Sequence, residues 1–228
     1  MIFRIVWLRI KPLSSQGFLK LTKAIAADQF TQGVTSGFIV DAERKSSLEA
    51  RFIQTRNFTE TVADPFGNES KFERTEYTQI KFTLFDQAPH LEIINPARNL
   101  TPLINRLGEL CEGKSAIYLP EQSVSELMQT MAEMASSAKF TGLLISNLQL
   151  SPTATAKVLI KSSEDVKKLL PKFIGQRSHT IKEAQLEILT PSGCQARITI
   201  KENCRLSVQT EKDEESVRFL RQMVHSLI

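Results

Sequence analysis

The chain has 228 residues, of which 41% are hydrophobic and 24% are charged, and its formal net charge is +4. These values are ordinary for a folded protein and exclude a disordered, collagen-like or coiled-coil chain. A net charge this small permits binding to nucleic acid or to an anionic surface but does not by itself indicate either.

The sequence shows no sign of secretion, of a membrane span or of a metal site. Its three cysteines are odd in number and lack CxxC spacing, which argues against a disulfide framework and against a zinc site. Arg4 and Arg9 interrupt the apolar start, and no stretch approaches the ~20 apolar residues of a membrane span. We therefore expect a cytoplasmic protein without membrane contact, metal or cofactor.

In the first half, strand patterns surround two helices. We expect a strand over 3–10, a helix over 17–28, strand-like alternation over 48–62, a loop around 64–72, strands over 74–85 and 91–95, and then a helix that ends at Gly113. The alternation of Ile80, Phe82 and Leu84 with polar residues is the clearest strand pattern. Residues 31–72 lack a clean period, so the strand order there stays open.

A helix over 121–138 follows, with Ser123 and Glu126 as a capping box. We then expect strands over 143–150 and 155–161, a helix that begins after Ser162 or Ser163 and ends at Gly175, strands over 184–189, 195–201 and 205–210, and a final helix over 214–227. The short turns between the last three strands indicate antiparallel neighbours.

Each half thus has the order strand, helix, antiparallel strands, helix. This internal repeat predicts an α+β protein of two tandem strand–helix–antiparallel sheet–helix units, 1–113 and 140–228, joined by a connecting helix within 114–139. Such units can form one continuous curved sheet with the helices on one face. The alternative is a single α+β domain with a long insertion.

The end of the sequence resembles a known family. Ala196-Arg197-Ile198-Thr199-Ile200, then Asn203 to Thr210, and then Lys212-Asp213-Glu214-Glu215-Ser216 at the start of a helix are similar to the end of a TATA-box-binding-protein repeat. That family has two tandem units that form a saddle on DNA, so the resemblance implies a TBP-like fold. It covers roughly the last 40 residues in sequence and the rest in element order only. Where that family kinks DNA with phenylalanines, this strand has Thr199 and Lys201.

If helices cover one face of the sheet, alternate polar residues lie on the other. The candidate contacts are Arg197, Lys201 and Arg205 in the second half, and Arg51, Lys81 and Tyr77 in the first. Cations on such a surface bind phosphates, and a tyrosine can stack on a base. The alternatives are a solvated face without a ligand and a face that contacts another protein.

His179 is the one candidate for catalysis, because Gln176-Arg177-Ser178-His179-Thr180 brings a nucleophile, a base and a cation close together. A metal-independent nuclease can use a histidine as its general base. No partner that would orient this histidine is identifiable, and the sequence has no glycine-rich phosphate loop.

The sequence therefore predicts a non-catalytic binding or adaptor protein whose polar, mildly basic sheet face binds nucleic acid. The alternative is a protein–protein interaction subunit of a larger complex, which docks through helix 121–138 or by sheet pairing, including pairing into a homo-oligomer. A nuclease that uses His179 is the third possibility.

Overall fold

The computed structural model describes residues 2–121, 123–189, 193, 195–202, 205–210, 218, 219 and 222. Strands account for 52% of the structure and helices for 23%. The helices are α1 (Ser15–Ala27), α2 (Thr101–Leu110), α3 (Val124–Met134) and α4 (Val166–Ile174). The strands are β1 (Ile2–Lys11), β2 (Ser36–Arg44), β3 (Ser47–Ala63), β4 (Glu69–Phe85), β5 (Leu91–Ile94), β6 (Ala116–Tyr118), β7 (Ser137–Ser151), β8 (Ala154–Lys161), β9 (Thr180–Leu189), β10 (Gln195–Lys201) and β11 (Arg205–Thr210).

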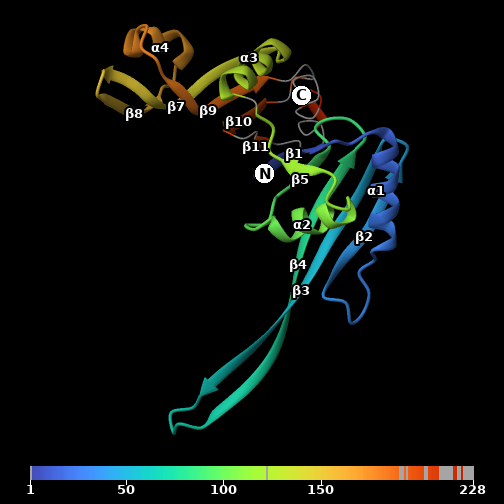
Figure 1. The fold of residues 1–228 in the computed structure, drawn as a ribbon. Helices are drawn as coiled ribbons and strands as arrows, with labels where there is room; N and C mark the ends of the chain where they lie inside the picture. Colours follow the sequence, from blue (N-terminus) through green and yellow to red (C-terminus); the bar gives the residue numbers. More distant parts are fainter. Residues whose placement is uncertain are drawn as a thin grey trace. The chain divides into compact units, whose positions relative to one another are not determined.

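The chain divides into two compact units (Figure 1). Unit 2 is one continuous stretch, Ile10–Ile117, whereas unit 1 combines Met1–Arg9 with Tyr118–Ile228. The N-terminal strand therefore belongs to the same unit as the C-terminal part of the chain, because Ile2 to Val6 of β1 pair antiparallel with β11.

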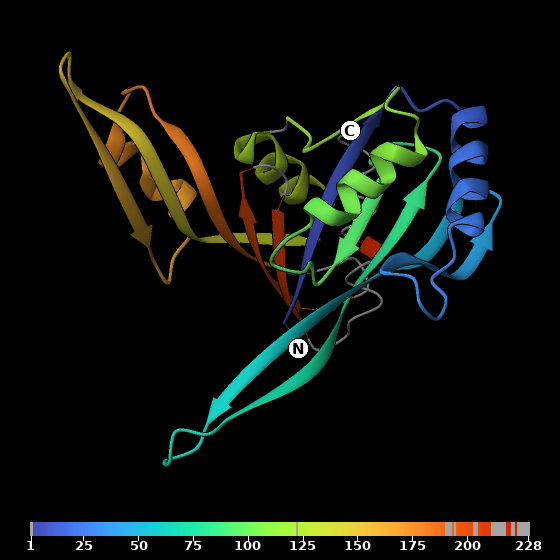
Figure 2. The same ribbon diagram turned by 60° about the horizontal axis from the view of Figure 1, so that its bottom comes forward.

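Unit 2 is built on antiparallel strands in the order β2-β3-β4-β5, with α1 and α2 alongside (Figure 2). Phe38, Phe52 and Phe82 lie side by side on one face of the sheet, with ring centroids 5.2 Å and 5.9 Å from that of Phe38. The side chains that fill this core from the helices are Phe18, Leu21, Ile25, Leu103 and Leu107. Period-two alternation in the strands and a 3.6-residue period in the helices place these apolar residues inward.

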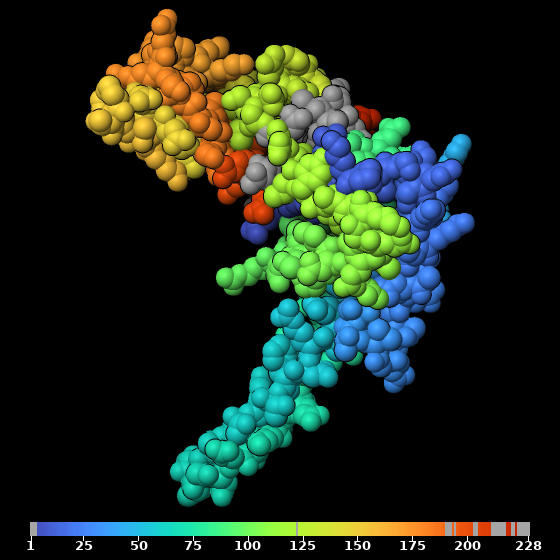
Figure 3. Space-filling view, viewed as in Figure 1, coloured from blue at the N-terminus to red at the C-terminus, as the bar shows by residue number. Residues whose placement is uncertain are grey.

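The β3–β4 hairpin extends beyond the core of unit 2. Its 17-residue strands pair without interruption from Ser47↔Phe85 to Ala63↔Glu69. Side chains near the base, such as Leu48 and Leu84, are buried, whereas every residue from Arg56 to Glu76 is exposed (Figure 3). Strand β4 begins inside the segment 64–72 that we expected to be a loop, because pairing with β3 continues to Glu69.

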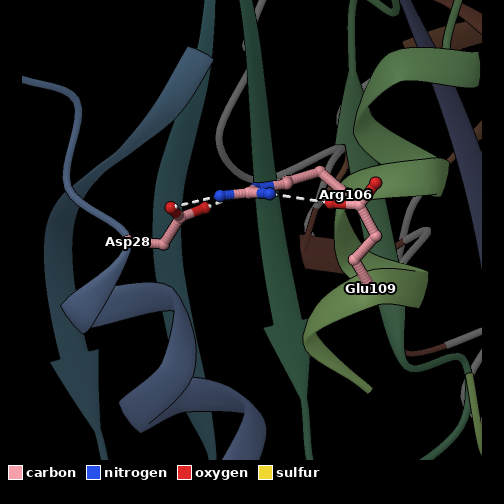
Figure 4. A network of polar contacts seen from close by, with 3 residues as sticks. All are labelled: Asp28, Arg106 and Glu109. Atoms are coloured by element: carbon pink, nitrogen blue, oxygen red, sulfur yellow. Dashed lines mark hydrogen bonds and ion pairs between the residues drawn. The ribbon is translucent and has the colours of Figure 1, made fainter. Parts of the chain in front are cut away.

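A polar contact ties the two helices of unit 2 together (Figure 4). Arg106 of α2 donates two hydrogen bonds to the carboxylate of Asp28, the C-cap residue of α1, at 2.6 and 2.7 Å, and one to Glu109 at 2.7 Å. The hydrogen bonds to Asp28, and then those to Glu109, raise the pKa of the Arg106 guanidinium above its ordinary value. The paired, planar contact fixes the direction in which the chain leaves α1.

After Asp28 the chain runs along the edge strand β2. The N–H of Phe38 donates to the carbonyl of Asp28 at 2.8 Å, and the N–H of Phe30 donates to the carbonyl of Phe38 at 2.9 Å. Gly37 makes this approach possible, because a Cβ at this position would lie 2.7 Å from the backbone nitrogen of Phe30. The segment thus covers part of an edge that would otherwise expose unpaired backbone groups.

Unit 1 is built on strands in the order β1-β11-β10-β9-β7-β8, and each neighbouring pair is antiparallel. Helix α3 begins at Ser123 with the predicted capping box, in which Ser123 and Glu126 bond each other's backbone N–H groups. The apolar stripe of α3, consisting of Val124, Leu127, Met128 and Met131, packs into the core together with Val166 and Ile174 of α4. The apolar side of the helix expected over 121–138 is therefore used inside this unit.

The predicted fold class of two tandem strand–helix–antiparallel sheet–helix units is wrong. The structure is α+β but mostly antiparallel strand, and the two halves do not repeat one strand–helix alternation. A single strand, β1, precedes α1, whereas the hairpin of β7 and β8 precedes α4. The repeat failed because β1 pairs with β11 from the far end of the chain, a pairing that local sequence patterns cannot show.

One predicted element, the final helix over 214–227, lies largely outside the described residues. Cys194, Cys204 and His225 lie outside them as well. The strands expected over 184–189, 195–201 and 205–210 are confirmed as β9, β10 and β11.

The close approach at Gly37 leads to a stability prediction. Gly37→Ala places a methyl group against the backbone of Phe30, so we expect a loss of about 1–3 kcal/mol in the free energy of unfolding, measured by urea denaturation. Gly108→Ala is the matched control, because Gly108 lies in α2 with open space at its Cβ position. That change is expected to stabilise by about 0.5–1 kcal/mol. Equal stability of Gly37→Ala and the wild type would contradict the tight approach.

Candidate nucleic-acid interface

In the part of unit 1 that the structure describes, α3 and α4 cover one face of the sheet and leave the other face without a helix. Along β9 and β10 every second residue is buried in the core with α3 and α4, namely Ala184, Leu186, Ile188, Ala196, Ile198 and Ile200. The residues between them point to the opposite side and are partly or fully exposed. We call this side the open face.

Strand register brings the three predicted cations of the second half together on the open face. Lys201 of β10 stands directly opposite Arg205 of β11, and Arg197 lies four residues from Lys201 on the same side of β10. Between these two rows, Thr199 stands opposite Ser207. Arg4 of β1 is the next residue in that row, because it pairs with Ser207. The open face therefore offers cations and hydroxyl groups on neighbouring strands.

Two of these cations have acidic neighbours on β9. Arg197 donates to Glu187 with an N–O distance of 2.7 Å, and Lys201 lies 3.3 Å from Glu183. All four side chains retain contact with solvent, so each pair contributes little to stability. Neighbouring carboxylates hold the cations in place but reduce the positive potential that a phosphate would meet.

Three further lysines belong to the open face, and the sequence reasoning missed them. Lys139 of β7 stands opposite Glu187, Lys161 of β8 stands opposite Gly142, and Lys157 lies on the same side of β8. The signal was present, since Lys157 and Lys161 alternate with residues 156, 158 and 160, which pack against the core. What the sequence did not show was that β7 pairs with β9 and so brings β7 and β8 beside the last strands.

Cations outnumber carboxylates on the described part of the open face. The cations are Arg4, Lys139, Lys157, Lys161, Arg197, Lys201 and Arg205, and the carboxylates are Glu183 and Glu187. The remaining positions are mainly short or polar, including Gly142, Gln185, Thr199, Ser207 and Gln209. The six strands from β8 to β1 span about 24 Å, since neighbouring strands lie ~4.8 Å apart. A surface of this charge and width suits the phosphates of a nucleic-acid backbone.

The predicted contacts of the first half lie in unit 2, where the charges are different. Arg51 is held by Asp41, with hydrogen bonds of 2.9 and 3.0 Å from its Nε to the two carboxylate oxygens. Lys81 lines a hollow of about 590 Å³ together with Asp41, Glu49 and Glu92. This surface is therefore not basic, and the argument for phosphate binding is weaker here than on the open face.

Tyr77 lies on β4 and is 67% exposed, with its ring edge-on to that of Phe30 at 6.4 Å. It stands opposite Thr55 of β3, close to the point where the hairpin leaves the core. The ring is accessible enough to stack on a base, but of the two cations predicted with it, Arg51 is paired with Asp41 and Lys81 lies beside carboxylates.

His179 lies in the loop before β9, and its ring has no described orienting carboxylate. Its Nδ1 is 2.9 Å from the carbonyl oxygen of Arg177, so Nδ1 carries the proton and Nε2 is the available base. The cysteine in the described part of the chain, Cys111, has its pKa raised by burial, which disfavours the reactive thiolate. Within the described residues, no group of three or more histidine, cysteine or acidic side chains is placed to hold a metal ion.

No helix in the described part of the chain is long and apolar enough to cross a membrane. No protein-family model matches the sequence, and no curated protein matches it significantly. The resemblance to TATA-box-binding proteins therefore stays a prediction, and function has to be argued from the residues themselves.

The stability of two variants tests which side of β10 faces solvent. Because Arg197 is exposed and Ile198 is fully buried, Arg197→Ala should lower the free energy of unfolding by less than about 1 kcal/mol, and Ile198→Ala by about 2–5 kcal/mol. Urea denaturation of both variants measures this difference. A larger loss for Arg197→Ala than for Ile198→Ala would mean that the strand presents its other side to solvent.

Proposed function

We propose that this protein binds nucleic acid non-catalytically through the open face of unit 1. The observation that supports this function is the gathering of seven cations and two carboxylates on the side of an antiparallel sheet that α3 and α4 do not cover. A solvated face without a ligand also carries polar residues, but it has no reason to separate the charges in this way.

The residue types on the open face indicate how it would bind. Lysine and arginine form salt-dependent contacts with phosphates, and hydroxyl and amide groups such as those of Thr199, Ser207 and Gln209 add hydrogen bonds to the backbone. None of the described residues of this face on β7 to β11 is aromatic, so base stacking contributes little there. We therefore expect affinity for the backbone with weak sequence preference.

Fluorescence anisotropy with labelled DNA and RNA, single-stranded and duplex, tests this function over a range of salt concentrations. The triple variant Arg197→Ala, Lys201→Ala, Arg205→Ala should bind at least about tenfold more weakly. Its plot of log affinity against log salt should be less steep by about 3, because each lost phosphate contact lowers the slope by roughly 1. Its melting temperature should stay close to that of the wild type, since all three side chains are exposed.

The matched control removes the same charge from unit 2, as Lys20→Ala, Lys23→Ala, Lys45→Ala. These three lysines are exposed and belong to unit 2, whereas the open face belongs to unit 1. The control should bind like the wild type. Equal weakening of both triple variants would show that only net charge matters, and binding of none of the probes by the wild type at low salt would refute the function.

Removing the acidic neighbours should have the opposite effect. Glu183→Gln with Glu187→Gln releases Lys201 and Arg197 from their ion pairs while keeping the size of the side chains. We expect tighter binding, by up to about thirtyfold, and a steeper salt dependence, since two exposed ion pairs of at most ~1 kcal/mol each are removed. Anisotropy under the same conditions measures it. Because loss of folding cannot tighten binding, unchanged or weaker affinity in the folded variant would argue against phosphate contacts at these two cations.

A further inference from the structure

The β3–β4 hairpin carries a second unusual surface, on the part that leaves the core of unit 2. We call residues 56–76 the arm; it forms the far part of the long two-stranded ribbon of β3 and β4 in Figure 1 and part of the projection in Figure 3. An isolated two-stranded ribbon is marginally stable in water. Packing in the core of unit 2 therefore does not explain an exposed arm of this length.

One side of the arm carries three large apolar side chains that nothing in the described chain covers. Phe58 stands opposite Arg74 and Glu60 opposite Phe72, so the two phenylalanines are diagonal neighbours on the same side, and Val62 lies on that side two residues beyond Glu60. All three are exposed, Phe72 by 57%. The opposite side carries polar residues, among them Asn57, Thr59 and Thr75. Charged residues lie on the same side as the phenylalanines, namely Arg56, Glu60, Arg74 and Glu76.

The tip of the arm holds one more phenylalanine in a fixed turn. The carboxylate of Asp64 accepts hydrogen bonds of 2.8 Å from the backbone N–H groups of Phe66 and Asn68 and from the side-chain amide of Asn68. These bonds lower the pKa of Asp64, the side-chain bond from Asn68 most of all. Phe66 is 90% exposed at this turn. An ordered turn that presents an aromatic side chain loses little entropy when that side chain is buried by a partner.

The charge of the arm indicates what kind of partner it fits. Its cations are Arg56, Lys71 and Arg74, and its anions are Glu60, Asp64, Glu69, Glu73 and Glu76. Some of these charges neutralise one another, since Arg74 pairs with Glu60 and Glu76. The excess of carboxylates disfavours nucleic acid and favours a basic surface that also offers apolar side chains.

The same chain has such a surface on the open face of unit 1. Leu144 of β7 stands opposite Leu159 of β8, which is 57% exposed, and Lys157 and Lys161 lie two residues to either side of Leu159. An apolar pair between lysines complements a phenylalanine between Asp64 and Glu69 in both polarity and charge.

We propose that the arm of one copy docks on the open face of a second copy, with Phe66 against Leu144 and Leu159 and with the arm's carboxylates near Lys157 and Lys161. Arm and receiving face are different surfaces, so the contact is heterologous and can continue from copy to copy. A ribbon of this length covers a few hundred Å² on each partner, below the ~800 Å² of a standard interface, so micromolar self-association is expected.

The proposal goes beyond nucleic-acid binding and does not depend on it, because self-association is measured with protein alone. Sedimentation velocity from about 1 to 100 μM should show concentration-dependent association at low salt that weakens at high salt. Two variants should stay monomeric, namely an arm variant, Phe66→Ser with Phe72→Ser, and a face variant, Lys157→Glu with Lys161→Glu. All four side chains are exposed, and circular dichroism checks that both variants fold. Phe173→Ser is the matched control, because it removes an exposed phenylalanine from α4 and should associate like the wild type.

Mixing the two monomeric variants gives the decisive result. The face variant keeps an intact arm and the arm variant keeps an intact face, so a 1:1 mixture should form heterodimers and nothing larger. A mixture that stays monomeric, a wild type that is monomeric at every concentration, or an arm variant that still associates would each overturn the proposal. Association of the wild type without nucleic acid would support it even if anisotropy detects no nucleic-acid binding, so the two proposals can fail separately.

Discussion

Helices α3 and α4 cover one side of the antiparallel sheet of unit 1, and the functional argument depends on this. Period-two alternation sends every second residue of β9, β10 and β11 to a core closed by α3 and α4. The residues between them must then face water or a ligand. Because these positions do not contribute to the core, their identities are free to serve another purpose, and here most of them are polar or charged.

Charge is distributed differently in the two units. On the open face, cations exceed carboxylates, and the ion pairs of Arg197 with Glu187 and of Lys201 with Glu183 stay in contact with solvent. In unit 2, Arg51 is paired with Asp41, and the arm carries more carboxylates than cations. A chain with one basic and one acidic, apolar surface has complementary surfaces available for contact between copies.

Local patterns in the sequence were sufficient where strands pair with their neighbours in the chain. The hairpin of β10 and β11 brings Lys201 opposite Arg205, so the grouping of these cations followed from alternation and a short turn. The pairing of β1 with β11 and of β7 with β9 spans long stretches of chain, and no local period encodes it. The tandem repeat was therefore predicted wrongly, and Lys139, Lys157 and Lys161 were left out of the site.

The open face has two candidate ligands, a nucleic-acid backbone and the arm of another copy, and they compete for Lys157 and Lys161. If both bind, mass action requires that nucleic acid dissociates the protein assemblies and that high protein concentration weakens the apparent affinity for nucleic acid. The two ligands differ in what they need, because phosphates require only cations whereas Phe66 also requires the apolar pair of Leu144 and Leu159. A substitution at Leu159 thus separates the two contacts, since it removes apolar surface from the arm's site without removing a positive charge.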